Sequence, residues 1–165
     1  MLGGIGLKLR NKVLLGICLL FLIGTFTGCG TGNEKGDIYN DNDRISRDGD
    51  SYSYTGRSQS SSNNQITVKY GKFSGADTIW IVESKGDCEI TFDYDSQVES
   101  GDFKGVLITP EKQVETVLEG TEDGEKTIKL AEGEYRFKFV GSKAKGKIKI
   151  SIEESKNVKV RQVDN

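Results

Sequence analysis

From Gln65 onward, apolar and polar residues alternate with a period of two, which places successive side chains on opposite faces of a β-strand. Polar, glycine-containing breaks recur about every 8 to 12 residues. The pattern predicts strands near residues 66–70, 78–83, 88–95, 103–109, 113–119, 125–130, 134–140 and 147–153. About eight half-buried strands, with no convincing helix, need a second layer to cover them. We therefore expect an all-β fold, an antiparallel β-sandwich, with closure into a barrel as the alternative.

Two of these strands have distinctive patterns. In 88–95, Cys88, Ile90, Phe92 and Tyr94 share one face, and Glu89, Thr91, Asp93 and Asp95 share the other. In 78–83, Trp80 and Val82 lie on one face and Ile79 and Ile81 on the other, so both faces are apolar. Such a strand is either central in a two-layer core or exposes its tryptophan.

The first residues of the chain have the layout of a secretory signal peptide. Lys8, Arg10 and Lys12 precede an apolar run, Val13–Ile23, and no acidic residue comes before Glu34. The run is about half the length of roughly 20 residues that a membrane-spanning helix needs.

The residues that follow, Phe26-Thr27-Gly28-Cys29, resemble the lipobox of bacterial lipoproteins. In that family a small residue precedes a cysteine that receives a diacylglyceryl group and becomes the new N-terminus. The resemblance implies cleavage between Gly28 and Cys29, lipidation of Cys29, and a membrane-anchored, extracytoplasmic location. The family usually has an aliphatic residue where this chain has Phe26. The alternatives to a lipoprotein signal are an uncleaved anchor and an ordinary signal peptide with a chance cysteine, and every case places the remainder outside the cytoplasm.

These features divide the chain into four parts. Residues 1–28 form the signal peptide, 29–64 the lipidated cysteine and a disordered linker, 65–154 the sandwich, and 155–165 a tail or edge strand. The linker is rich in Gly, Asn, Asp and Ser and has too few apolar residues to bury a core. Its expected r.m.s. reach is about 30 to 35 Å.

Composition excludes several classes of function. The chain has no histidine, which removes the Ser-His-Asp arrangement and most zinc or copper sites. The formal net charge of −2 gives no overall case for nucleic-acid binding. Of the three cysteines, only Cys88 lies in the predicted domain, so an internal disulfide is ruled out once Cys29 is acylated. We expect no cofactor.

Asp93 and Asp95 are the candidates for carboxylate chemistry. Two positions apart on one strand face, their side chains lie about 7 Å from each other, a spacing compatible with a glycan hydrolase. With Glu99 and Asp102 nearby in sequence, the same pair is a weak candidate for a Ca²⁺ site. The simpler interpretation is a solvated outer face, so we expect no enzyme and no metal.

Charge is segregated along the chain. Between residues 83 and 125, thirteen acidic residues face three basic ones, whereas residues 126–161 contain eleven basic and four acidic. If strands 134–140 and 147–153 pair as a hairpin, Arg136, Lys138, Lys147 and Lys149 form a basic ladder. Like charges directly opposite are unfavourable. Acidic residues elsewhere in the chain offset them, or the ladder binds a polyanion.

Trp80, Tyr70 and Tyr94 raise a third possibility. Sugar-binding sandwich modules resemble the predicted architecture and stack saccharide rings on exposed aromatic side chains. Aromatic residues on strands are more often part of a core.

The segment Leu130–Ile152 resembles the closing hairpin of small jelly-roll domains in secreted bacterial proteins, a resemblance that implies a jelly-roll-like sandwich and no catalytic motif. We therefore expect non-catalytic binding at the cell envelope, with a glycan, a polyanion or a protein as partner. The alternatives are a structural component that docks a protein and, less favoured, a small carboxylate-dependent glycan hydrolase.

Overall fold

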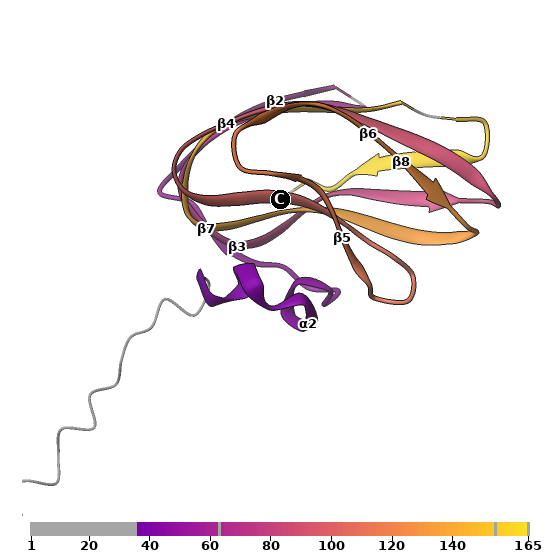
Figure 1. The fold of residues 1–165 in the computed structure, drawn as a ribbon, viewed down its shortest axis with the longest axis horizontal. Coiled ribbons are helices and arrows are strands. Elements are labelled where there is room, and N and C mark those ends of the chain that lie inside the picture. Colours follow the sequence, from indigo (N-terminus) through magenta and orange to yellow (C-terminus); the bar gives the residue numbers. More distant parts are fainter. Residues whose placement is uncertain (1–35, 63, 154, 165) are drawn as a thin grey trace, which may run out of the picture. The chain divides into compact units, whose positions relative to one another are not determined.

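The computed structural model describes residues 36–62, 64–153 and 155–164 and confirms the predicted antiparallel β-sandwich (Figure 1). Within these residues a 3-10 helix and a short α-helix precede eight strands. They are η1 (Gly36–Asn40), α2 (Asn42–Ile45), β1 (Ser51–Ser53), β2 (Gly56–Ser62), β3 (Gln65–Ser84), β4 (Cys88–Ile108), β5 (Val114–Glu119), β6 (Glu122–Leu130), β7 (Gly133–Glu153) and β8 (Val158–Gln162).

Three long strands, β3, β7 and β4, lie side by side in that order and contribute to both layers. In layer one, the first half of β3, the second half of β7 and the first half of β4 are flanked by β2 and β6. In layer two, the other halves are flanked by β5 on one side and by β1 and β8 on the other. At one end of the sandwich, β3, β4 and β7 therefore pass from one layer into the other without a break in the chain.

The bends coincide with interruptions of the strand register. Register shifts occur between Tyr70 and Gly75 in β3 and between Val98 and Asp102 in β4. Gly101 has a φ of +71°, and a Cβ there would lie 2.5 Å from the backbone oxygen of Lys143. Only glycine fits such a close approach at positive φ. The bend of β4 therefore depends on this residue.

These bends change how the predicted strands are joined. The breaks expected near residues 74–77, 99–102 and 141–146 do not end strands, so six predicted strands merge into three long ones. The predicted pairing of 134–140 with 147–153 is wrong, because both segments belong to β7 and lie in different layers. The eight observed strands are completed by β1, β2 and β8.

The main core lies between the layers and is rich in aromatic rings. Trp80 packs against Phe137 with 5.4 Å between ring centroids, and Phe137 stacks on Phe92 at 4.9 Å. Ile148 and Ile150 are fully buried from layer one. The alternating pattern therefore predicted the buried faces of the layer-one halves of β4 and β7 correctly, whereas in their layer-two halves both faces are buried, Lys138 included.

A second, smaller core lies on the outer side of layer two. Ile38, Tyr39 and Ile45 from η1 and α2 pack on a patch made of Ala76, Val106, Ile108 and Val140. This N-terminal segment, residues 36–50, lies below the sandwich in Figure 1. It covers an apolar patch contributed by β3, β4 and β7. The second apolar face predicted for 78–83 is not part of this patch, because a register shift between Thr78 and Trp80 lets Ile79 join Trp80 and Val82 in the main core.

Part of the predicted disordered linker is therefore ordered. Residues 36–62 form the N-terminal segment, β1 and β2, all packed on β3 or its neighbours. At the other end of the chain, β8 pairs with β3, so the tail includes an edge strand. Residues 29–35 lie outside the described part of the chain.

An ion pair between a buried lysine and a partly exposed aspartate fixes the N-terminal segment to layer two. Lys138 is fully buried, and its Nζ lies 3.1 Å from Asp50 Oδ1. The same ammonium donates a 2.7 Å hydrogen bond to the backbone oxygen of Arg47, and Asp50 accepts hydrogen bonds from the backbone nitrogen and hydroxyl of Thr78. Burial lowers the pKa of Lys138, and Asp50 opposes that shift.

We predict that Lys138→Met lowers the free energy of unfolding by about 3 kcal/mol, because it leaves Asp50 without its buried partner. The double variant Lys138→Met/Asp50→Asn should lose less, since no uncompensated charge remains. Urea unfolding measures both. Lys156→Met, on an exposed loop, is the control and should change stability by less than about 0.5 kcal/mol. Equal stabilities of Lys138→Met and the control would show that the ion pair does not hold the segment.

Candidate functional site

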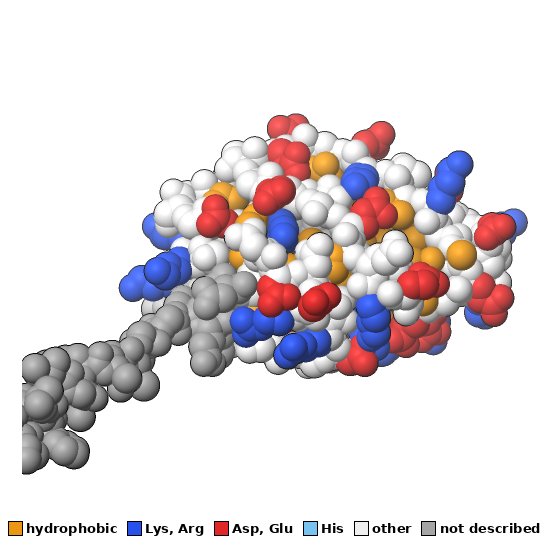
Figure 2. Space-filling model, turned by 60° about the horizontal axis from the view of Figure 1, so that its bottom comes forward, with side chains coloured by type: hydrophobic (Ala, Val, Ile, Leu, Met, Phe, Trp, Pro, Cys, Tyr) orange, Lys and Arg blue, Asp and Glu red, His pale blue; other side chains and the backbone are white. Residues whose placement is uncertain are grey.

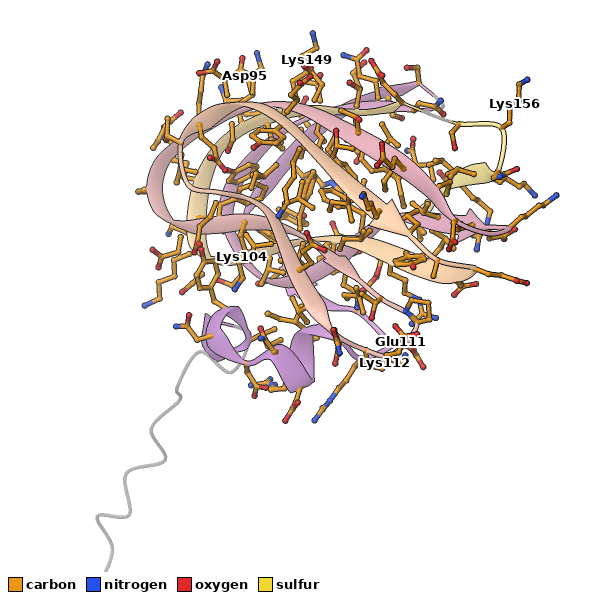
Figure 3. All side chains as sticks on the ribbon, turned by 45° about the vertical axis from the view of Figure 1, so that its right-hand side comes forward. Asp95, Lys104, Glu111, Lys112, Lys149 and Lys156 are labelled. Carbon is orange, nitrogen blue, oxygen red and sulfur yellow. The ribbon has the colours of Figure 1, made fainter. Side chains whose placement is uncertain are left out.

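The outer side of layer one is an exposed sheet surface that we call the polar face. It is made of outward-pointing side chains from β3, β7 and β4, namely Thr67, Lys69, Lys147, Lys149, Ser151, Asp93, Asp95 and Gln97. Asp95 and Lys149 point away from the sandwich at the top of Figure 3. The N-terminal segment lies on the opposite side, so it does not cover this face.

Strand register sets the order of charges on the polar face. Lys149 of β7 lies opposite Asp95 on β4 and opposite Thr67 on β3. Lys147 lies opposite Lys69 on one side and Gln97 on the other. Directly opposed side chains have Cβ atoms about 4.5 to 5.5 Å apart. The face therefore has a basic half along β3 and β7 beside an acidic half along β4.

The structure brings together residues that the sequence placed in two separate candidate sites. Asp93 and Asp95 were candidates for calcium or catalysis, and Lys147 and Lys149 for a polyanion ladder. Strand pairing places these donors and acceptors on neighbouring positions of one face, and Gln97 Nε2 donates a 3.3 Å hydrogen bond to Asp95. Among the described residues, no group of three or more Asp, Glu, Cys or His side chains is placed to hold a metal ion.

The aromatic candidates do not lie on this face. Trp80 is fully buried, Tyr70 is 3% exposed and Tyr94 is 9% exposed. Tyr70 stacks on Phe103 with 4.7 Å between ring centroids, inside the main core. A saccharide ring has no access to these buried ring faces, so the stacking hypothesis for Trp80, Tyr70 and Tyr94 is wrong. Their role is to fill the space between the layers.

The other half of the predicted basic ladder is neutralised within the chain. Arg136 Nη2 pairs with Glu134 at 3.0 Å, and Arg136 also pairs with Asp48 of the N-terminal segment. Lys138 is buried against Asp50. The polyanion hypothesis therefore fails for Arg136 and Lys138, and the segment supplies the offsetting charge that the sequence analysis required. Figure 2, with this side turned toward the viewer, shows acidic and basic side chains interspersed.

Asp48 is the centre of this surface cluster. It pairs with Lys112 as well as with Arg136, and these two residues also line a small hollow of about 200 Å³ beside Pro110 and Glu134. The hydrogen bond from Lys112, followed by that from Arg136, lowers the pKa of Asp48 to about 2. Figure 3 shows Lys112 beside the N-terminal segment.

Sequence reasoning missed the functions of Asp48, Asp50 and Lys112 because the chain around the aspartates looked like a solvated linker. The available evidence was the acidic cluster at 41–50 together with the unbalanced bases after residue 126. Gly28 and Cys29 lie outside the described residues. Within the described part, neither helical segment has the length and apolar content needed to cross a bilayer.

Comparisons with known proteins give likenesses of fold. No protein-family model and no curated protein matches the chain.

Solved structures with a similar fold include the carbohydrate-binding module CBM6cm-2 from Cellvibrio mixtus lichenase 5A in complex with cellotriose. It is 12% identical with a TM-score of 0.37, and the match covers 62% of this chain and 90% of that one. CBM35 from Cellvibrio japonicus Abf62 is 13% identical with a TM-score of 0.37, over 68% and 81%. The enzymatically active domain of bacteriophage CBA120 tailspike protein 4 is 11% identical with a TM-score of 0.38, over 79% and 21%. Such distant likenesses carry no conclusion about a ligand.

We predict that Asp48→Asn lowers the melting temperature in a pH-dependent way. Because the folded pKa of Asp48 lies below the unfolded value of about 3.9, its carboxylate stabilises the fold above about pH 4. That contribution is lost as pH falls through about 2. Thermal melts at several pH values should show the wild-type and variant curves converging in acid. A difference that stays constant down to pH 2 would contradict the ion-pair origin.

Proposed function

We propose that the chain is a non-catalytic binding module whose polar face takes a hydroxyl-rich ligand of the cell envelope, a glycan. The observation that carries the proposal is the difference between the two outer faces. The outer side of layer two is covered by the N-terminal segment, whereas none of the described residues covers the polar face. Covering one sheet face while leaving the other as a regular polar surface is the arrangement expected of a display scaffold.

The chemistry of the polar face suits neutral hydroxyl groups. Lys147 and Lys149 supply ammonium donors, Asp93 and Asp95 supply carboxylate acceptors, and Gln97 supplies both kinds of group. A sugar hydroxyl donates one hydrogen bond and accepts others, so neighbouring donors and acceptors match a diol. A strong polyanion would meet Asp93 and Asp95 beside the lysines, which opposes its binding.

The carboxylate arrangement supports binding rather than hydrolysis. Asp93 and Asp95 are neighbours on the same face of β4 and point outward from the sheet. A glycosidase needs its two carboxylates on either side of the scissile bond. Two side chains in one row on an open surface do not enclose a sugar in this way.

The same proposal includes an extracytoplasmic location through a lipid on Cys29. Its support is the basic start of the chain, the apolar run Val13–Ile23 and the lipobox-like residues 26–29. Each buried methylene group contributes about 0.8 kcal/mol, so two or three acyl chains hold a small domain at a membrane.

For the glycan, we predict that the double variant Asp95→Ala/Lys149→Ala binds purified envelope glycan at least tenfold more weakly than the wild type, because each lost hydrogen bond to a charged group is worth about 1.5 to 3 kcal/mol. Co-sedimentation with insoluble glycan measures the affinity. Asp87→Ala/Lys156→Ala is the matched control, since it removes one acid and one base at positions off the polar face.

Salt separates glycan recognition from attraction to a polyanion. Hydrogen bonding to neutral hydroxyls should survive about half-molar salt, at which the Debye length falls to a few ångströms. Binding that disappears at that concentration, or that is unchanged in the Asp95→Ala/Lys149→Ala variant, would refute the assignment of the polar face to a glycan.

For the anchor, we predict that protein isolated from its native membrane has the mass of residues 29–165 plus acyl chains. Intact mass spectrometry, with and without lipase treatment, measures this. Cys29→Ser should leave the protein unacylated and released from the membrane or unprocessed. A wild-type mass equal to the full chain, or to an unacylated form, would refute the anchor while leaving the glycan proposal intact.

A further inference from the structure

Strand β2 forms an edge of layer one, and no second strand pairs with it within the described residues, although Gln162 of β8 donates a 3.1 Å hydrogen bond to the hydroxyl of Ser61. It pairs with β3 through seven consecutive residues without a register shift, and β3 is its strand partner within the described residues. Its residues from Ser58 to Ser62 are exposed. The outer edge of such a strand presents backbone N–H and C=O groups that can pair with another strand.

Natural proteins usually protect sheet edges with charged residues, prolines or bulges. β2 has one charged residue, Arg57, which turns back to the buried carboxylate of Asp77 at 3.2 Å. From Ser58 to Ser62 the strand has no charge and no proline. Its edge is thus regular, neutral and open.

The other edges are protected. β6, at the far side of layer one, has five charged residues among nine, namely Glu122, Asp123, Glu125, Lys126 and Lys129. In layer two, β5 carries Glu115 and Glu119, β8 carries Lys159 and Arg161, and β1 is three residues long. A molecule with one open edge can form a closed pair but not a fibre, because each pairing consumes the open edge of both partners.

We propose that β2 pairs antiparallel with β2 of a second copy of this chain. Side chains on opposed strands must lie on matching faces, and a two-fold axis at Gln59 pairs the whole strand. Ser58 of each copy then lies opposite Ser60 of the other, and Arg57 opposite Ser61. This arrangement brings no like charges together, which is why a second copy fits this edge.

The symmetry of the pair also fits display from one membrane. The two-fold axis of an antiparallel strand pair runs perpendicular to the sheet, so both copies keep the same side of layer one facing the same way. Layer one becomes a continuous sheet of ten strands, five from each copy. Both polar faces lie on one side, and both N-terminal segments lie on the other.

A charge-exchange experiment tests the pairing. The variants Ser58→Lys/Ser60→Lys and Ser58→Asp/Ser60→Asp each place like charges opposite one another across the axis, and a mixture of the two places opposite charges there. Sedimentation equilibrium of the full chain in detergent micelles measures self-association at high protein concentration, since a seven-residue strand pair forms a small and weak interface. The matched control, Thr116→Lys/Thr127→Lys, adds two charges to β5 and β6.

We expect a wild-type dimer, at least roughly tenfold weaker association in each doubly charged variant alone, and a restored dimer in the mixture. The control should associate like the wild type. A monomeric wild type, a polymer instead of a dimer, or charged variants that dimerise as strongly as the wild type would each overturn the proposal. Near-ultraviolet circular dichroism shows that each variant is folded, so loss of association cannot come from unfolding.

Discussion

Three strands that run through both layers are the constraint on which this structure depends. Because β3, β4 and β7 each bend from one layer into the other, the two layers are covalently joined at three adjacent points. The register in one layer thereby sets the register in the other. Two glycines at the bends, Gly75 and Gly101, have positive φ and leave no room for a Cβ. The inner faces then meet in one alignment, with Trp80, Phe137 and Phe92 in contact.

The strands could be predicted because alternation is a local property. The faces of 88–95 and 147–153 needed only the neighbours along the chain, and burial in the structure follows them. The bends could not be predicted, because a glycine-rich stretch such as 141–146 looks the same whether it ends a hairpin or bends a single strand. The packing of the N-terminal segment could not be predicted for a different reason. Ile38 and Tyr39 are separated from Ile45 by an entirely polar stretch, Asn40–Arg44, so the segment has too few apolar residues to show a periodicity. Their burial depends on a sheet face formed by residues far away in sequence.

Individual residues of the candidate site could be predicted from the sequence, but their arrangement on one face could not. Asp95 and Lys149 were both singled out from sequence, but their proximity depends on the pairing of β4 with β7. The predictions for Lys138 and Trp80 were wrong for a similar reason, because the burial of each side chain depends on residues that are distant in sequence. Lys138 belongs to the same alternating pattern as its solvent-exposed counterpart Lys149, yet it lies beneath the N-terminal segment, whose position no local pattern predicts. Trp80 lies on a strand with two apolar faces, and local pattern alone does not reveal which of them faces the main core.

The packing of the N-terminal segment has a consequence for how far the domain stands from the bilayer if Cys29 is acylated as proposed. The sequence-based linker of 36 residues allowed a loose tether of about 30 to 35 Å. The described structure instead begins at Gly36, seven residues after Cys29, and seven residues span at most about 25 Å even when fully extended. The lipid would then keep Gly36, and with it the N-terminal segment, within that distance of the headgroups. A ligand would therefore meet a domain held near the bilayer surface, not one that moves on a long tether through the cell wall.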